Sequence, residues 1–355
     1  MRLNPLLNKI QYFPKDIFHA GNNLSSKIRI DSLEYKLIDT KKFNRTHHLL
    51  RISIKKEGNF FVLKILAYAD PDKGVNIRGF EFLYAYRDVL EKICMEQSVK
   101  NISIIINTGD QDAWSPSLCM DRKIQPNNPN MLIPTIYDTR LYLLNKDKLN
   151  NMTKWCILTS KETFTKQWSK RRKAMFWRGS NSGANLPGQN LNIRSAFCKN
   201  NLGSKLIDAK ILVKPNIDIQ ENYYTNLFSN AEAFENYMFY PDIDGWVRAW
   251  GTLEKMTSGM LIFQNHNKER ELLWDRLLEP WIHFIPIEKN FDDTLKKIRW
   301  CIENIQDSSE IAFRGKIQAI KYIKNLPLIV ENSLLKYIDK LPRTTPTSLN
   351  YLEHK

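Results

Sequence analysis

The chain has 355 residues, of which 43% are hydrophobic and 11% aromatic. This is enough apolar material for two globular domains of ordinary size, and it excludes a largely disordered protein. Lysine and arginine outnumber aspartate and glutamate by 53 to 38, a formal net charge of +15. The excess favours an anionic partner such as a nucleic acid, a membrane surface or a phosphorylated small molecule, although solvated lysine side chains can also account for it.

The cysteines and the apolar segments narrow the class of protein. Five cysteines are scattered along the chain without a Cys-x-x-Cys pair, so the sequence suggests neither a disulfide framework nor a thiolate zinc site. No apolar run reaches the roughly 18 residues of a membrane span, and Met1 to Phe18 lack the apolar core of a secretion signal. We therefore expect a cytoplasmic protein.

The first half of the chain mixes strands with a helix. Apolar residues recur on one helical face between Phe80 and Cys94, and strands are expected at residues 49–54, 60–67, 101–107 and 131–136. The strand NISIIIN at 101–107 runs into a polar loop at 108–116, where a sheet commonly exposes functional side chains. We assign residues 1–155 to an N-terminal α/β domain.

From residue 160 onward, strands and helices alternate. Helices are predicted at 160–173, 192–200, 247–257 and 268–278, and strands at 174–177, 205–213, 237–240, 260–264 and 283–287. Such alternation indicates a parallel sheet with crossover helices, so residues 156–328 are predicted to form a Rossmann-like domain. Further helices are expected at 291–304, 308–323 and 330–341, the last within a C-terminal segment, residues 329–355.

The run FWRGSNSG, Phe176 to Gly183, has the composition of a phosphate-binding turn. A buried strand ends at Arg178, whose guanidinium offers several hydrogen-bond donors in a fixed geometry. Gly179 allows the backbone to come close to a ligand, and Ser180 adds a hydroxyl. A helix begins soon afterwards, and helix N-termini favour anions. An ordinary strand-to-helix turn with a structural arginine explains the same residues.

Two further loops are expected at the carboxyl ends of strands. In PDIDGWVR, Asp244, Gly245 and Arg248 can bind a ribose hydroxyl, allow close backbone approach and bind a pyrophosphate, or they can only shape a turn. In the other loop Asp110 follows a buried strand, where a carboxylate can act as a general base or cap a turn. Asp110-Gln111-Asp112 and Asp242-Ile243-Asp244 also have the Asp-x-Asp form of a divalent-cation site.

The densest basic patch lies on the helix predicted at residues 160–173. Its basic side chains are Lys166, Lys170, Arg171, Arg172 and Lys173. A solvated helix face is the ordinary explanation, and attraction to anionic lipid headgroups is the functional one.

Together these motifs resemble glycosyltransferase family 90, the group of the fungal capsule-associated xylosyltransferases, animal protein O-glucosyltransferases and bacterial lipopolysaccharide-modifying enzymes. The resemblance extends over roughly residues 101–322. It rests on FWRGSNSG, on YPDIDGW with the later MTSGMLIFQ, and on LLEPWIHFIPIEKNFDDTLKKIRWCIEN. It implies the GT-B fold of two Rossmann-like domains, with the acceptor on the N-terminal side, and a UDP-linked donor bound without a metal or other cofactor.

The resemblance also implies roles for particular residues. The Arg-Gly-Ser motif corresponds to Arg178, Gly179 and Ser180, and the loop that closes over the diphosphate resembles residues 244–251, which include Asp244, Gly245, Trp246 and Arg248. Asp110 matches the family's base. Some relatives have an arginine where this chain has Leu186, and Arg194 in the next helix is its candidate substitute.

The resulting hypothesis is an inverting glycosyltransferase. Asp110 would deprotonate an acceptor hydroxyl, while Arg178, Ser180, Arg194 and Arg248 stabilise the departing diphosphate. The basic charge and the bacterial relatives indicate a glycolipid or lipopolysaccharide-type acceptor, with peripheral contact at the inner face of an anionic membrane. The alternatives are a metal-dependent transferase that uses Asp242 and Asp244, and a nucleic-acid-binding module; the latter leaves the Arg-Gly-Ser loop unexplained.

Overall fold

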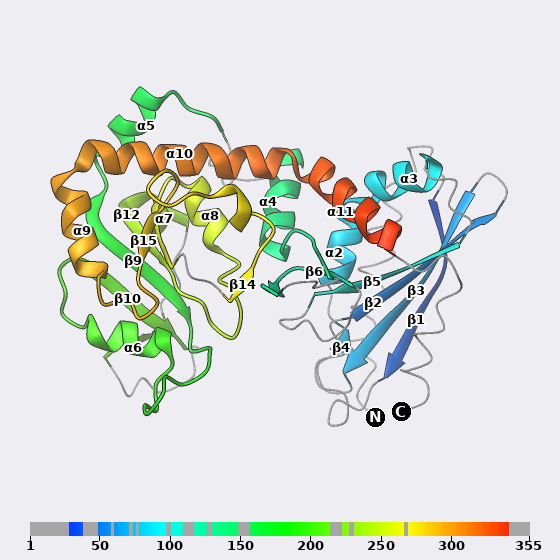
Figure 1. Cartoon of the computed structure of the whole chain (residues 1–355), viewed down its shortest axis with the longest axis horizontal. Helices are drawn as coiled ribbons and strands as arrows, with labels where there is room; N and C mark the ends of the chain where they lie inside the picture. The colour runs from blue at the N-terminus through cyan, green and yellow to red at the C-terminus, as the bar shows by residue number, and fades with distance from the viewer. Residues whose placement is uncertain are drawn as a thin grey trace. The chain divides into compact units, whose positions relative to one another are not determined.

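The computed structural model describes residues 28–37, 49–57, 60–70, 74–75, 78–96, 101–108, 117–125, 130–147, 157–213, 222–226, 231–265 and 269–340. The chain divides into two compact units (Figure 1). Unit 1 contains residues 1–119, 127–133 and 327–355, and unit 2 contains residues 120–126 and 134–326.

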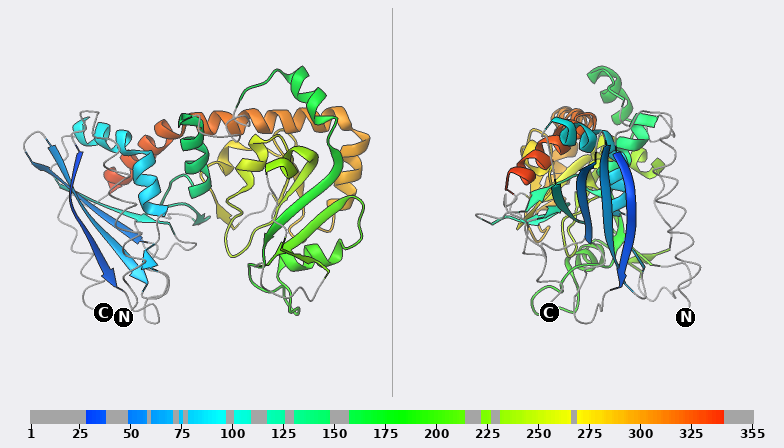
Figure 2. Two further views of the ribbon diagram at one scale, coloured as in Figure 1. Left: turned by 180° about the vertical axis from the view of Figure 1, so that it is seen from behind. Right: turned by 90° about the vertical axis from the view of Figure 1, so that its right-hand side faces the viewer.

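Unit 1 contains a mixed sheet. Its strands are β1 (Ile28–Leu37), β2 (Leu49–Glu57), β3 (Phe60–Asp70), β4 (Gly74–Val75), β5 (Asn101–Asn107), β6 (Leu118–Cys119) and β8 (Met131–Leu132). They lie in the order β1-β3-β2-β5-β6-β8, and β4 pairs with β3. β2 is antiparallel to both of its neighbours, whereas β1 is parallel to β3 and β5 is parallel to β6. Figure 2 shows these strands forming one twisted layer.

The antiparallel pairing of β2 with β3 follows from the short connection between them. Only two residues separate these strands, and a parallel crossover needs a dozen or more. The predicted α/β class is confirmed, but a Rossmann-like sheet in this half of the chain is not, so the two-domain GT-B architecture stays a prediction.

The helices of unit 1 differ from the predicted ones in detail. The helix expected at 80–94 is two helices, α2 (Arg78–Ala85) and α3 (Arg87–Glu96), which meet at the buried Tyr86. The C-terminal helix α11 (Leu326–Lys340) belongs largely to this unit, since the hydroxyl of Tyr337 accepts a hydrogen bond from the β5 amide of Ile105 at 3.3 Å.

Unit 2 contains a parallel sheet of six strands. They are β9 (Arg172–Ser180), β10 (Ile207–Leu212), β11 (Tyr224–Thr225), β12 (Tyr237–Asp242), β13 (Leu261–Asn265) and β15 (Ile285–Ile287). They lie in the order β11-β10-β9-β12-β13-β15, and every ladder between them is parallel. The predicted parallel sheet of the second half is therefore observed.

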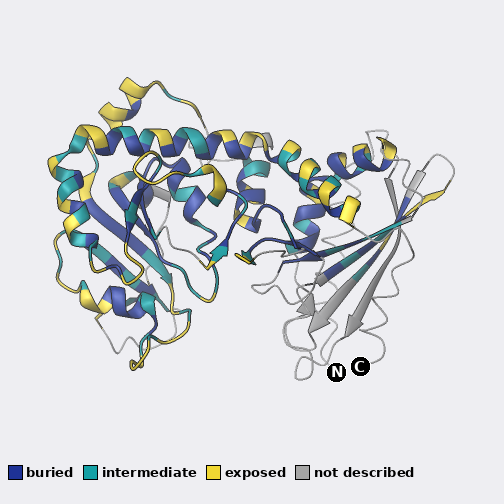
Figure 3. Ribbon diagram, in the orientation of Figure 1, coloured by how far each residue is buried: buried dark blue, intermediate teal, exposed yellow. Residues whose placement is uncertain are grey.

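Helices surround this sheet. They are α4 (Ile136–Asp147), α5 (Lys161–Trp168), α6 (Ile193–Asn200), α7 (Ala231–Asn236), α8 (Thr252–Thr257), α9 (Thr294–Glu303) and α10 (Ile305–Lys324), with a short 3-10 helix, η3, at Asp275–Leu277. The long α10 runs along one side of the unit and packs on α5, α8 and β13 (Figure 1). Figure 3 shows its buried residues alternating with exposed ones, as on an amphipathic helix.

Several predicted elements differ from the observed ones because of side-chain contacts. The strand expected at 131–136 is short because Thr135 and Asp138 cap the start of α4: each backbone N–H bonds the other's side chain, at 3.0 and 3.2 Å. Residues 136–147, which we assigned to the N-terminal domain without predicting a helix there, form α4, which packs on α8 and α10. The basic helix ends at Trp168, since Arg171 donates to the carbonyls of Phe234 and Ser258 and the chain enters β9.

No α-helix forms at residues 269–278, the described part of the helix predicted at 268–278. Its place is taken by η3 and by β14 (Arg270–Glu271), which pairs antiparallel with β7 (Arg122–Lys123). Glu271 accepts a hydrogen bond from Arg122. This pairing offsets the free-energy cost of burying the two charged groups. A contact across about 150 residues of sequence thus overrides a helical pattern.

Candidate active site

The candidate site lies at the topological switch point of unit 2. Strands β10 and β11, which follow β9 in the chain, lie on one side of β9, and the next strand, β12, lies on its other side. In open parallel sheets, ligands bind outside the carboxyl ends of the strands at such a point. Ser180 ends β9 and Asp242 ends β12, so the FWRGSNSG turn and the PDIDGWVR loop both leave the sheet there.

The turn after β9 is joined to the start of α6. The Oδ1 atom of Asn181 accepts hydrogen bonds from Asn192 Nδ2 at 2.5 Å and Ser195 Oγ at 2.8 Å. Asn192 is the N-cap of α6, and its own Oδ1 accepts from the backbone amides of Arg194 and Ser195, both at 3.1 Å. The cap explains why the helix starts where the sequence predicted, and it fixes the turn relative to the helix.

Arg194 connects the two loops. Its guanidinium donates to the carbonyls of Ile243 and Asp244 at 3.0 to 3.2 Å, and to the carbonyl and hydroxyl of Ser180 at 3.3 and 3.4 Å. It also lies over the ring of Trp177, 5.7 Å from the centroid. Burial lowers the pKa of this guanidinium, but an arginine remains protonated. Among the described residues its hydrogen bonds go to neutral oxygens, so its positive charge is not cancelled by a paired carboxylate.

Two glycines allow the loops to touch. A Cβ added to Gly245 would lie 2.6 Å from Ser182 Oγ and 3.2 Å from Arg194 Cζ. Gly183 has a φ of +118°, and its own added Cβ would lie 3.3 Å from the carbonyl carbon of Gly245. Larger residues would force the loops apart. Next to Gly245, the side chain of Trp246 is 59% exposed.

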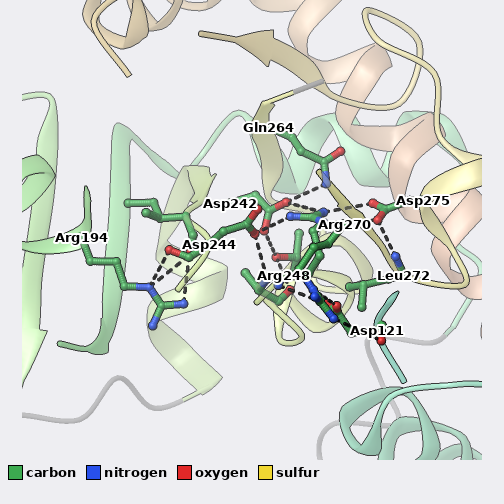
Figure 4. A network of polar contacts seen from close by, with 12 residues as sticks. Asp121, Arg194, Asp242, Asp244, Arg248, Gln264, Arg270, Leu272 and Asp275 are labelled. Carbon is green, nitrogen blue, oxygen red and sulfur yellow. Dashed lines mark hydrogen bonds and ion pairs between the residues drawn. The ribbon is translucent and has the colours of Figure 1, made fainter. Parts of the chain in front are cut away.

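Arg248 is the centre of a buried charge network (Figure 4). Its guanidinium contacts Asp242 at 3.1 Å, Asp275 at 3.0 Å and Asp244, and its side chain is only 2% exposed. Burial by itself would lower the pKa of Arg248, but the carboxylates of Asp244, Asp242 and Asp275 outweigh it and raise the pKa well above its usual range. The backbone amide of Arg248 donates to Asp121.

The same network uses the carboxylates of the Asp-x-Asp pattern. Asp242 accepts from Thr252 Oγ1 at 2.5 Å and from Gln264 Nε2 at 2.6 Å in addition to Arg248. Asp244 accepts from the Ala249 amide at 2.9 Å. Within the ranges that the structure describes, no group of three or more histidine, cysteine, aspartate or glutamate residues is placed to hold a metal ion.

Arg178 lies within the sheet. Its guanidinium bonds Asp208 of β10 at 2.8 Å, the Asp208 carbonyl at 3.0 Å and the Trp177 carbonyl at 2.8 Å, and it stacks on Phe176 at 4.5 Å. Tyr237 of β12 donates to the other oxygen of Asp208. A Cβ on Gly179 would collide with the Trp177 ring at 2.5 Å. These residues hold the strands and the turn in position.

The structure therefore brings most of the predicted site residues together. Ser180, Arg194, Asp244, Gly245, Trp246 and Arg248 lie at or beside the switch point, and Arg178 and Gly179 lie just inside β9. Asp110 and Asp112 are outside the described residues. Sequence reasoning did not find Asp121, Asp208 and Asp275, because each meets its arginine through long-range packing and no local pattern marks it.

A comparison with models of protein families shows to which family the chain belongs. A model of glycosyl transferase family 90 matches residues 147–327, just over half of the chain. The chain belongs to glycosyl transferase family 90. Apart from Asp121, the family 90 match includes the described residues of the candidate site, and it begins after Asp110.

Individual curated proteins match segments of different lengths in the chain. Uncharacterized protein 179R of Invertebrate iridescent virus 6 is 25% identical over 216 residues, covering 52% of this chain and 18% of that protein. Human protein O-glucosyltransferase 3 is 31% identical over 86 residues, covering 24% of the chain and 17% of that protein. Protein O-glucosyltransferase 2 of Danio rerio is 24% identical over 151 residues, 42% of the chain and 29% of that protein. The chain thus spans less than a third of the length of each of these curated relatives.

One solved structure similar to this family 90 chain is Anabaena Alr3699/HepE in complex with UDP-glucose. It has a TM-score of 0.32 and 14% sequence identity, and the match covers 50% of this chain and 53% of that one.

Proposed function

We propose that the chain is a glycosyltransferase that moves a sugar, glucose, xylose or a related one, from a UDP-sugar to a hydroxyl of an acceptor. The observation that carries the proposal is the position of Arg194 at the switch point, between the Ser180 turn and the Asp244–Gly245 backbone. A charged guanidinium bonded to neutral groups can exchange them for phosphate oxygens. Family membership and the protein O-glucosyltransferase relatives support this choice of reaction.

Within the proposed site, the residues divide into ligands and supports. Arg194, Ser180 and the backbone at Gly245 would contact the diphosphate, and Trp246 presents an exposed ring beside them. Arg178 and Arg248 would shape the site through Asp208 and the buried carboxylates, rather than contact phosphate. A positioned donor at a developing negative charge can lower the barrier by about 3 kcal/mol, so a few such donors suffice to assist departure of UDP.

The proposed mechanism is inverting and uses Asp110 as the base. Its carboxylate accepts the proton of the acceptor hydroxyl, the oxygen forms a bond to the anomeric carbon, and the bond to UDP breaks on the opposite face. Asp110→Asn cannot accept the proton, and a fall of about 100-fold or more in turnover is expected for a lost general base. Near-normal turnover of the folded variant would exclude Asp110.

Donor binding is proposed to need no metal or other cofactor. The partners of Asp242 and Asp244 support this, because both carboxylates already bind Arg248. A metal-dependent Asp-x-Asp transferase would have to break these pairs. Transfer that stops in a chelator and returns with magnesium or manganese would favour that alternative.

Titration with UDP tests the proposed donor site. Calorimetry would compare wild type, Arg194→Ala and the control Arg299→Ala, an exposed arginine of α9. A hydrogen bond to a charged group contributes about 1.5–3 kcal/mol, so Arg194→Ala should weaken binding roughly 10- to 100-fold, with the control unchanged. Absence of saturable UDP binding to the folded wild type would refute the proposal, and equal affinities would refute the role of Arg194.

For the acceptor, we propose a glycolipid or lipopolysaccharide-type molecule, reached by peripheral contact with an anionic membrane on the cytoplasmic side. Lys166, Lys170, Arg172 and Lys173 are exposed next to one another in sequence, whereas Arg171 is bonded to backbone carbonyls. In the part of the chain that the structure describes, no helix is long and apolar enough to cross a bilayer.

Vesicle flotation tests the membrane contact. Wild type should float with vesicles that contain anionic phospholipid and stay behind with neutral ones, because each basic residue near such a surface contributes about 1 kcal/mol. Changing Lys166, Lys170 and Lys173 to glutamate should abolish flotation. Equal behaviour on neutral and anionic vesicles would exclude an electrostatic membrane contact.

A further inference from the structure

Unit 2 contains a cavity of about 400 Å³ that the candidate active site does not use. Its lining residues come from α6, the loop before it and the segment that leads into α9. Figure 1 labels the two helices. Leu186, Ile193, Phe197, Phe291 and Leu295 supply its apolar lining. The volume falls within the range of about 300–1,000 Å³ that is usual for small-molecule sites.

The polar lining of the cavity consists mainly of uncharged side chains. Gln189, Asn200, Asn201 and Asn290 contribute carboxamides, Asp292 contributes the one carboxylate, and neither lysine nor arginine belongs to the lining. Carboxamides donate and accept hydrogen bonds at the same time, which suits hydroxyl groups. The absence of a lining cation disfavours phosphate, so the ligand chemistry differs from that proposed for the switch point.

The backbone of Phe291 is held in a conformation that bulky residues rarely adopt. Its φ is +66°, and non-glycine residues in this left-handed region occur preferentially at functional sites. The Phe291 carbonyl accepts from Thr294 Oγ1 at 2.7 Å, and its ring meets Phe197 edge to face at a centroid distance of 5.3 Å. The strained residue thus completes the aromatic wall of the cavity.

Helix α6 separates the cavity from the active site. Ile193, Phe197 and Asn200 recur at the i, i+4, i+7 spacing of one helical face and line the cavity. Arg194, the residue that follows Ile193, donates instead to the Ile243 and Asp244 carbonyls. One helix therefore borders two sites, one with a cationic arginine and one lined by apolar and carboxamide side chains.

We propose that this cavity binds an uncharged sugar ring. Apolar and aromatic groups contact its C–H surface, and the carboxamides and Asp292 bind its hydroxyls. That the sugar belongs to the acceptor glycan rests on the proposed function; sugar binding itself does not.

The test uses the whole chain and neutral sugars. Saturation-transfer NMR and calorimetry would measure glucose, galactose, xylose and their methyl glycosides, with uridine and glucose 6-phosphate as comparators. Asn200→Trp and Gln189→Trp place a bulky ring at exposed positions of the rim, and Lys199→Trp is the matched control because Lys199 is exposed on α6 but does not line the cavity.

We expect saturable binding of a neutral sugar to wild type, at least fivefold weaker in either rim variant and unchanged in the control. UDP affinity should be the same in all four proteins. The inference is overturned if no neutral sugar binds, if both rim variants bind like wild type, or if uridine or glucose 6-phosphate is preferred. Loss of the proposed function would appear separately, as sugar binding without UDP binding.

Discussion

Replacement of Arg248 by methionine would show what this residue does. Methionine has a similar length but carries no charge, so Arg248→Met leaves Asp242, Asp244 and Asp275 without their shared cation. The side chains of Arg248 and Asp242 are 2% and 0% exposed, whereas that of Asp244 is 40% exposed. Water can therefore compensate for the loss at Asp244 but not at Asp242.

The magnitude follows from the buried pair. Removal of one partner of a buried ion pair costs about 3–5 kcal/mol, because the other charge remains desolvated. A domain of 150–250 residues loses roughly 2–4 °C in Tm for each kcal/mol. We therefore expect the unfolding transition of unit 2 to fall by about 6–20 °C.

The assay combines urea unfolding, followed by tryptophan fluorescence, with calorimetric Tm and UDP titration. The matched control is Arg276→Met, which removes an arginine that is also ion-paired, with Glu271, but whose side chain is 62% exposed. An exposed pair is worth at most about 1 kcal/mol. A loss of stability in Arg248→Met no greater than in the control would refute the reasoning, and a large loss of UDP affinity without such a loss would make Arg248 a ligand.

Three other predictions follow from the contacts in unit 2. Gly245→Ala should weaken UDP binding about tenfold or more, since its Cβ would lie 2.6 Å from Ser182 Oγ; adding Ser182→Ala should restore part of the affinity, and no restoration would exclude this clash. Arg178→Met should lower the free energy of unfolding by about 1–3 kcal/mol through the lost bonds to Asp208, with UDP affinity within about threefold of wild type; a loss like that of Arg194→Ala would contradict it. Burial raises the pKa of Asp138 to about 7, so the folded protein holds a proton that the unfolded chain releases near pH 4, and the contribution of Asp138 to stability should fall as pH rises from about 4 to 7. Urea unfolding should show that the free energy of unfolding of Asp138→Asn rises relative to that of wild type over this pH range. Parallel curves of stability against pH for the two proteins would contradict the prediction.

Much of unit 2 could be predicted from local sequence. The strands at Ile207–Leu212, Tyr237–Asp242 and Leu261–Asn265 were predicted within a few residues, as was α6. Their apolar periodicity, and the Asn192 cap, are contained within a few neighbouring positions. The family motifs are equally local.

The predicted helix at 247–257 shows where local patterns fail. Only Thr252–Thr257 is helical, because Asp244 binds both the Arg248 side chain and the Ala249 amide and holds the preceding residues in a loop. The same contacts place Arg248, which the sequence predicts as a phosphate ligand, at the centre of a buried charge network.

What the sequence by itself determined is the set of parallel strands in unit 2, the turn and loop at their carboxyl ends, and membership of the family those motifs resemble. The tertiary structure alone decided how the arginines are used. Arg248 meets carboxylates 27 and 127 residues away, and Arg194 reaches a loop about 50 residues away. Such contacts form only in the folded unit, where β9 lies beside β12 and β7 pairs with β14. A side chain's partners, more than its type, then determine whether its charge is neutralised or available to a ligand.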